Sequence, residues 1–206
     1  YNAVYKTVSI LEDTKNSKGE IPKILSDALA ISFDPSVGHS YLDDAEDRYV
    51  FYHTIEERLP FDLSYFNKIT NGGVCKKTLN VFLAGTAVGK SLALCHLGAS
   101  YLMLGKNVLY ITLEMSQERI AERIDANLLN IPLKDLQNLP KQMYDKKINQ
   151  IKSKTVGRLF IKEYPTATAS VSHFRALLNE LEIKKDFVPD VILIDYLNIA
   201  ASSRMT

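Results

Sequence analysis

Residues 79 to 91 read Leu79-Asn-Val-Phe-Leu-Ala-Gly-Thr-Ala-Val-Gly-Lys-Ser91, an apolar run followed by small residues and a Gly-Lys-Ser triplet. The apolar run is predicted to be a β-strand, and the segment Leu92 to Leu104 is predicted to be a helix. A strand, a small-residue loop ending in Gly-Lys-Ser and a helix, in this order, are typical of a phosphate-binding P-loop. The stretch therefore predicts a nucleotide site built on an α/β fold.

The chemistry of the predicted loop follows from its residue types. Small residues let successive backbone N–H groups converge on phosphate oxygens, and a helix starting at Gly89 adds its unpaired N–H groups and dipole. Lys90 is expected to reach the β and γ phosphates, and the Ser91 hydroxyl to bind Mg²⁺. Ala84 stands where the motif usually has glycine. Eight consecutive residues are predicted to bind nucleotide: Ala84, Gly85, Thr86, Ala87, Val88, Gly89, Lys90 and Ser91.

Composition and charge narrow the class of protein. The 206 residues are 46% hydrophobic and 24% charged, which is ordinary for a globular protein. A net charge of +1 excludes a globally basic nucleic-acid surface, so DNA contacts would need local loops or assembly. Cys75 and Cys95 show no metal-binding spacing and fit a reducing compartment. The apolar stretch Leu92 to Leu104 is too short to span a bilayer, so we expect a soluble, cytoplasmic protein.

The N-terminal region has a different character from the rest of the chain. Lys23 to Phe33 is amphipathic and has no obvious local partner for its apolar residues. It either packs on its own domain or docks on a neighbouring subunit, and composition leaves both open. Tyr41 to Glu57 is predicted to be a helix with an acidic start. We place a boundary near residues 57–62, which divides the chain into a helical arm, 1–58, and a nucleotide-binding domain, 59–206.

Beyond the P-loop, strands and helices alternate. Continuous apolar strands separated by helices predict a parallel sheet covered on both faces. The predicted strands are Lys106 to Leu113, Gly157 to Lys162 and Val191 to Asp195. The predicted helices run from an N-cap at Ser116 to about Leu129, from Tyr144 to Lys154, and from an N-cap at Ser170 or Ser172 to near Asp186.

Two carboxylates follow predicted strands, where parallel sheets place their active groups. Asp195 ends an apolar strand in the Walker B arrangement, which holds Mg²⁺ opposite the P-loop serine, although a strand-end aspartate can also be a simple turn residue. Glu114 is a candidate general base for polarising an attacking water. It could equally be an acidic first-turn residue that stabilises the next helix.

These segments together resemble the hexameric replicative DNA helicases of the DnaB family, in particular those of T-even-type bacteriophages, which have a RecA-like ATPase core. The likeness rests on Leu79 to Ser91, Ile111-Thr-Leu-Glu-Met-Ser116 and Val191-Ile-Leu-Ile-Asp-Tyr-Leu197. It extends through Ala28 to Asp34, Val37 to His39, Arg123 to Asn127 and Phe174 to Leu181, and so covers almost the whole chain.

The resemblance implies roles for particular residues. Lys90 and Ser91 would bind the phosphates of ATP or another NTP and Mg²⁺, Glu114 would be the catalytic carboxylate, and Asp195 would be the Walker B metal ligand. In the family, a linker helix before the ATPase domain packs on the adjacent subunit, and Ile21 to Phe33 matches it. This favours subunit docking for that segment.

The resemblance also implies a setting and its limits. The family acts as a homo-hexamer on single-stranded DNA at a replication fork, with a primase and a helicase loader as partners. The 206 residues match the linker and the first half of the ATPase domain, so we expect nucleotide binding without full hydrolysis from these residues alone. The alternatives are a RecA-like recombinase or ATPase, and a non-catalytic oligomerisation and nucleotide-binding module.

Overall fold

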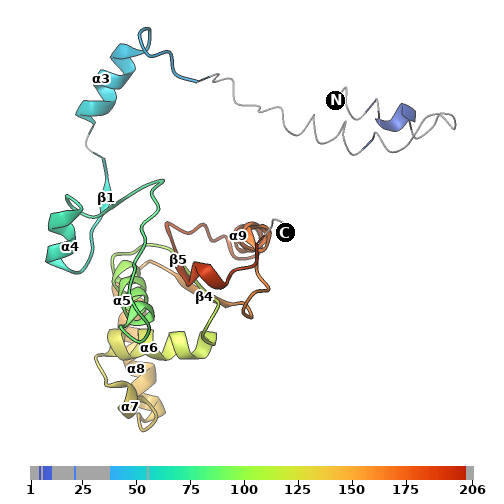
Figure 1. Cartoon of the computed structure of the whole chain (residues 1–206). Helices are drawn as coiled ribbons and strands as arrows, with labels where there is room; N and C mark the ends of the chain where they lie inside the picture. The colour runs from blue at the N-terminus through green and yellow to red at the C-terminus, as the bar shows by residue number, and fades with distance from the viewer. Residues whose placement is uncertain (1–4, 6, 11–20, 22–37, 55, 203–206) are drawn as a thin grey trace. The chain divides into compact units, whose positions relative to one another are not determined.

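The computed structural model describes residues 5, 7–10, 21, 38–54 and 56–202. The chain divides into two compact units, Tyr1–Ile55 and Glu56–Thr206, which we describe separately (Figure 1). The predicted helix from Lys23 to Phe33 lies outside the described residues, so both interpretations of it stay open. No helix among the residues described has the length and apolar character needed to cross a membrane.

Helix α3, Ala45–His53, is the main described element of the first unit. It is shorter at both ends than the predicted helix from Tyr41 to Glu57. The first turn contains Glu46 and Asp47, as the acidic start predicted, and Thr54 ends the helix in an extended conformation. The predicted length was wrong because the sequence around this segment lacks a strong periodic apolar face, which leaves the helix ends weakly specified.

The second unit begins with a small antiparallel ribbon of β1, Arg58–Leu59, and β2, Val74–Cys75, on either side of α4, Ser64–Ile69. Gly73 has φ +126°, and a Cβ built there would lie 2.1 Å from the Leu59 carbonyl oxygen. Only glycine fits this close approach of two backbones. The Asn67 side chain bonds both the N–H and the C=O of Phe61, each at 2.7 Å, which fixes the entry into α4.

The centre of the second unit is a parallel sheet in the order β4-β3-β5. The three strands are β3, Val108–Thr112, β4, Leu159–Glu163, and β5, Val191–Asp195. In the register, Thr112 lies opposite Glu163 on one side and Asp195 on the other. The predicted parallel sheet is confirmed, and its β3 is buried along its whole length, as a central strand covered on both faces must be.

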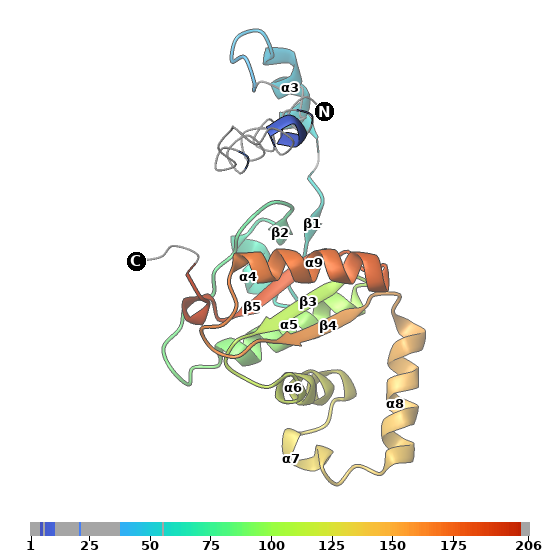
Figure 2. The ribbon, with the colours of Figure 1, turned by 90° about the vertical axis from the view of Figure 1, so that its right-hand side faces the viewer.

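Helices cover both faces of this sheet (Figure 2). On one face, α5, Lys90–Met103, and α6, Gln117–Leu129, pack against alternate residues of β3, namely Val108 and Tyr110. On the other face, α9, Val171–Lys185, packs against Leu109 and Ile111. The remaining elements are α7, Leu133–Leu136, α8, Lys141–Lys154, and a 3₁₀ turn, Leu197–Ile199.

The helix caps agree with their sequence signals. The Ser116 hydroxyl accepts a hydrogen bond from the Arg119 N–H, as predicted for an N-cap. Of the two candidates before α9, Ser170 is the N-cap, and its backbone N–H donates to His173 Nδ1 at 3.1 Å. The histidine takes the place of the glutamate or glutamine of a capping box.

The predicted strand from Leu79 to Ala84 is wrong. This run forms no strand ladder with any described residue, and β5 pairs only with β3. Its side chains still alternate: Leu79, Val81 and Leu83 are exposed, while Phe82 joins an aromatic cluster with Phe61 and Phe66. The apolar alternation is therefore real, but a strand also needs a hydrogen-bonding neighbour, and no described strand supplies one.

Candidate nucleotide-binding site

The predicted P-loop lies directly before α5. Ala87 and Gly89 have left-handed backbone conformations, with φ 60° and 107°, and α5 begins at Lys90. Alternation of left- and right-handed residues turns successive N–H groups toward one side and forms a nest for anions. Because Gly85 to Val88 are exposed, the loop is open to a phosphate that would meet both the nest and the helix N-terminus.

The Lys90 amine lies across the loop. Its Nζ donates to the carbonyl oxygens of Ala84 and Gly85, at 3.0 and 3.1 Å. The same Nζ lies 5.9 Å from the centre of the Tyr196 ring, next to the end of β5. The lysine therefore closes the P-loop on one side and faces the carboxyl end of β5 on the other.

Asp195 ends β5 with a side chain that is 1% exposed. Its Oδ2 accepts a hydrogen bond from the Tyr110 hydroxyl at 3.0 Å, whereas Oδ1 is buried and has no hydrogen-bond partner in the described part of the chain. A buried carboxylate oxygen without a donor is costly, and a metal ion is one of the groups that removes this cost.

Helix α5 connects Asp195 with the P-loop. The Tyr110 hydroxyl that bonds Asp195 also lies 3.9 Å from Cys95 Sγ on α5. Ser91 precedes Cys95 by four residues and so lies on the same face of the helix, one turn nearer its N-terminus. The structure thus brings Lys90, Ser91 and Asp195 to one end of the sheet.

These residues fit a magnesium ion. A serine hydroxyl and a carboxylate oxygen are hard oxygen ligands, and Mg²⁺ usually takes only one or two of them from protein, with phosphates and waters completing its shell. The described part of the chain has no group of three or more His, Cys, Asp or Glu residues able to hold a metal. A metal here would accordingly depend on nucleotide phosphates for part of its coordination.

Glu114 lies two residues past the end of β3, at the same end of the sheet as Asp195. Its side chain is exposed, and the structure gives it no hydrogen bond or ion pair with another described residue. The turn that carries it is fixed by Thr112, whose Oγ1 accepts from the Met115 N–H and donates to the Met115 carbonyl. Glu114 precedes the N-cap Ser116, and the acidic residue in the first turn of α6 is Glu118.

Sequence reasoning missed Tyr110 and Cys95. Burial, followed by the neighbouring Cys95 and Asp195, raises the pKa of the Tyr110 hydroxyl far above its ordinary value. Burial likewise raises the pKa of the Cys95 thiol. The available signal was a polar-tipped tyrosine in the middle of an otherwise apolar strand, since a buried hydroxyl usually has a partner.

A Gly-Lys-Ser loop before a helix and a buried aspartate at the end of a parallel strand are the arrangement of a RecA-like P-loop fold. Residues 59–206 match the family model described as DnaB-like helicase C terminal domain. The chain belongs to this family.

Individual relatives agree with the family assignment. The DnaB-like replicative helicase of Enterobacteria phage T4 is 46% identical over 100% of this chain and 46% of that protein. The DNA repair protein RadA of Campylobacter jejuni is 25% identical over 80% of the chain and 36% of that protein. RadA of Rickettsia conorii is 30% identical over 63% of the chain and 31% of that protein.

A solved structure, described as a DnaB-like replicative helicase and its interactions with primase, matches with a TM-score of 0.59 and 16% identity. The match covers 100% of this chain and 50% of that one, and at this identity it supports the fold alone. The chain spans less than half of each of the three sequence relatives.

Proposed function

We propose that this chain is the nucleotide-binding part of an ATP-dependent replicative DNA helicase that translocates on single-stranded DNA and unwinds duplex at a fork. The observation that carries the proposal is the buried Asp195, which Tyr110 links to Cys95, one helical turn along α5 from Ser91 of the P-loop. Family membership and the likeness to the phage T4 helicase supply the reaction.

The proposed site roles follow phosphoryl-transfer chemistry. The P-loop from Ala84 to Ser91 binds ATP or another NTP, and Lys90 stabilises charge on the γ-phosphate. Ser91 and Asp195 would hold Mg²⁺, which supplies further neutralisation of phosphate charge when bound. Glu114 is proposed as the base that orients the attacking water, because its exposed carboxylate lies at the same end of the sheet.

The proposed architecture has a helical arm, 1–58, before a RecA-like domain, 59–206. We propose a homo-hexamer in which the linker segment from Ile21 to Phe33 docks on a neighbouring subunit, with nucleotide sites at the interfaces. Single-stranded DNA, a primase and a helicase loader are the proposed partners. The solved DnaB-like helicase, which is described together with its primase interactions, supports the primase among them.

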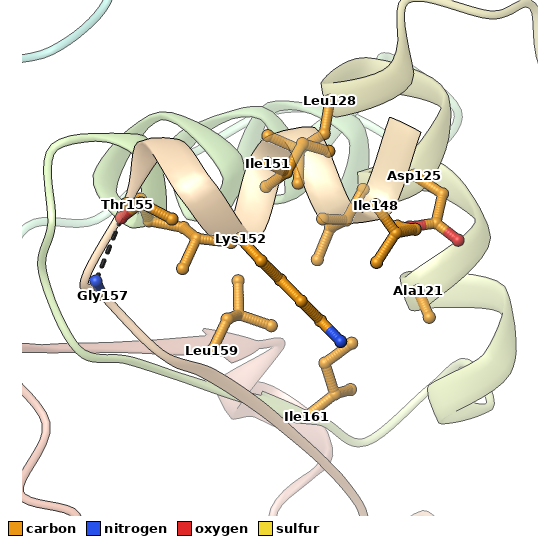
Figure 3. Close-up of a pocket in the computed structure, with 12 residues that line it drawn as sticks. Ala121, Asp125, Leu128, Ile148, Ile151, Lys152, Thr155, Gly157, Leu159 and Ile161 are labelled. Carbon is orange, nitrogen blue, oxygen red and sulfur yellow. Dashed lines mark hydrogen bonds between the residues drawn. The ribbon is translucent and has the colours of Figure 1, made fainter. Parts of the chain in front are cut away.

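The RecA-like domain offers a surface suited to such a linker. An apolar groove of about 360 Å³ lies between α6, α8 and β4 (Figure 3). Leu128, Ile148, Ile151, Leu159 and Ile161 line it, and Lys152 extends across it. An amphipathic helix buries its apolar face in grooves of this kind, and the linker carries apolar residues at helical spacing. We propose this groove as the acceptor for the linker of a second copy.

Two substitutions test the site in an assembled, DNA-stimulated ring. Lys90→Ala is expected to abolish ATPase activity, because the transferring phosphate loses its cation. Glu114→Gln is expected to keep nucleotide affinity while turnover falls by at least about 100-fold, within the range for loss of a general base. Titration with a fluorescent ATP analogue alongside phosphate release separates the two effects. Normal turnover of Lys90→Ala would refute the proposed site.

A second candidate function is a RecA-like recombinase or repair ATPase, which the two RadA relatives favour. Electron microscopy with a non-hydrolysable nucleotide and single-stranded DNA distinguishes the two. A six-membered ring that unwinds duplex supports the helicase, whereas a strand-exchange filament supports the recombinase. Nucleotide binding without hydrolysis by the 206 residues alone would support a partial ATPase core, as the helicase proposal expects of this part of the protein.

A further inference from the structure

Tyr110 lies at the centre of the second unit with 0% exposure, and its hydroxyl lies at the one end of the sheet where the nucleotide site is proposed. The hydroxyl reaches diagonally across the sheet. In the register Tyr110 lies opposite Leu193, yet it bonds Asp195, which is two residues further along β5. Only a long side chain with a polar tip covers this separation.

The residue directly opposite Asp195 does not provide this bond. Thr112 lies opposite Asp195 in the register, but its hydroxyl already makes two hydrogen bonds with the Met115 backbone in the turn that carries Glu114. Tyr110 is therefore the side chain that the structure gives Asp195 as a hydrogen-bond donor, and it bonds one carboxylate oxygen only.

This single bond has a directional consequence. The terminal torsion of an aspartate is soft and roughly two-fold, so a carboxylate at a strand end does not fix its own plane. A donor at Oδ2 fixes that plane and leaves Oδ1 buried and unpaired. Carboxylates that ligate metals are commonly oriented in this way by a hydrogen bond to the oxygen that does not bind the metal.

We propose that Tyr110 is a positioning residue for Asp195, holding its carboxylate so that Oδ1 is presented to the divalent cation of the bound nucleotide. The proposal rests on the metal role proposed for Asp195. It adds a residue from the middle of the neighbouring strand that no motif marks. Cys95, at 3.9 Å from the same hydroxyl, packs Tyr110 against the helix that carries Ser91.

The test is Tyr110→Phe in the full chain, loaded with a non-hydrolysable ATP analogue and titrated with Mn²⁺ under electron paramagnetic resonance. The Mn²⁺ dissociation constant is expected to rise by about tenfold or more, the usual effect of removing a group that orients a ligand. Affinity for the analogue in EDTA is expected to stay unchanged. An equal loss of both affinities would mean general damage to the fold and would overturn the proposal.

Two further variants make the result specific. Tyr101→Phe removes another buried hydroxyl, one without a hydrogen-bond partner, and is expected to leave Mn²⁺ binding unchanged. In an Asp195→Asn background, Tyr110→Phe is expected to add nothing, because its effect acts through the lost carboxylate. Additive losses in this cycle would overturn the positioning role.

The Asp195 variant also separates this inference from the proposed function. If Asp195→Asn binds Mn²⁺ as tightly as the wild type, Asp195 is not a metal ligand. The metal role proposed for Asp195 and the positioning role of Tyr110 then both fail. If Asp195→Asn weakens Mn²⁺ but Tyr110→Phe does not, only the role of Tyr110 is overturned.

Discussion

Asp195 and Tyr101 show how differently two buried polar side chains can be used in one core. The Asp195 carboxylate, 1% exposed, has a donor on one oxygen and none on the other. The Tyr101 hydroxyl, 2% exposed, has no hydrogen-bond partner among the described residues. A neutral hydroxyl costs far less to bury than an ionised carboxylate, so Tyr101 is tolerable as packing, while Asp195 calls for a compensating group.

Tyr101 is expected to make the free energy of unfolding depend on pH in the alkaline range. Burial raises the pKa of Tyr101 from 10.0 to about 12. Above pH 10 the unfolded chain releases this proton while the folded chain keeps it, so unfolding becomes easier as pH rises. Between pH 10 and 12 the free energy of unfolding should fall by about 1.4 kcal/mol per pH unit through this group.

Urea unfolding followed by circular dichroism at several pH values between 9 and 12 measures this slope. Tyr101→Phe should reduce it by the contribution of one proton, with stability at neutral pH equal or slightly higher because an unpaired hydroxyl is removed. Identical slopes for the two proteins would show that Tyr101 ionises in the folded state as easily as in the unfolded chain.

At the scale of elements, the run from Leu79 to Ala84 before the P-loop differs most from its prediction. It has the alternating apolar pattern of a strand, but its anchor is the ring of Phe82, which lies 6.3 Å from Phe61 and 6.0 Å from Phe66 between ring centres. A side-chain cluster therefore holds this segment where a strand ladder was predicted. The P-loop position consequently depends on aromatic packing near α4.

Phe82→Ala should destabilise the second unit by roughly 1–2 kcal/mol, less than the 3–5 kcal/mol of a fully buried phenylalanine because the ring is half-buried. Leu83→Ala is the matched control: this side chain is 94% exposed, and its removal should cost less than about 0.5 kcal/mol. Chemical denaturation of both variants compares them. A larger loss at Leu83 would mean that the exposed face of the run is covered in solution.

At the scale of the whole molecule, the two units differ in how much of their apolar surface is buried. The second unit has cores on both faces of its sheet. In the first, α3 has no buried residue and exposes Tyr49, Val50, Phe51 and Tyr52. The groove between α6, α8 and β4 adds an apolar surface on the second unit. The proposed assembly of several copies would cover exposed apolar surfaces of this kind.

The linker proposal predicts that Ile148→Asp prevents ring assembly, because a carboxylate would enter the apolar groove without a partner. Leu25→Asp, on the linker side, should have the same effect. Asn149→Asp introduces the same group on an exposed neighbouring position of α8 and should leave assembly intact. Sedimentation velocity with nucleotide compares the three variants. Rings formed by Ile148→Asp would exclude this groove as the docking surface.

Local patterns in the sequence were enough to predict the helix after the Gly-Lys-Ser triplet, the Ser116 cap, the three parallel strands and the position of Asp195 at a strand end. These features depend on periodicity and on residue types a few positions apart, so the sequence alone predicts them. The choice between Ser170 and Ser172, and the length of α3, required the structure, because helix ends are set by weak local competition.

The contact between Tyr110 and Asp195 joins residues 85 positions apart, and only the tertiary structure reveals it. Only the tertiary structure likewise shows that the run from Leu79 to Ala84 pairs with no described strand. Apolar alternation indicates that one face of a segment is buried, but it does not indicate which strand lies beside the segment. Strand order and register determine both features, and they are properties of the assembled sheet. The sequence by itself determined the parallel α/β fold and predicted the kind of site. The packing of β3 between β4 and β5 decided which side chain reaches the Asp195 carboxylate.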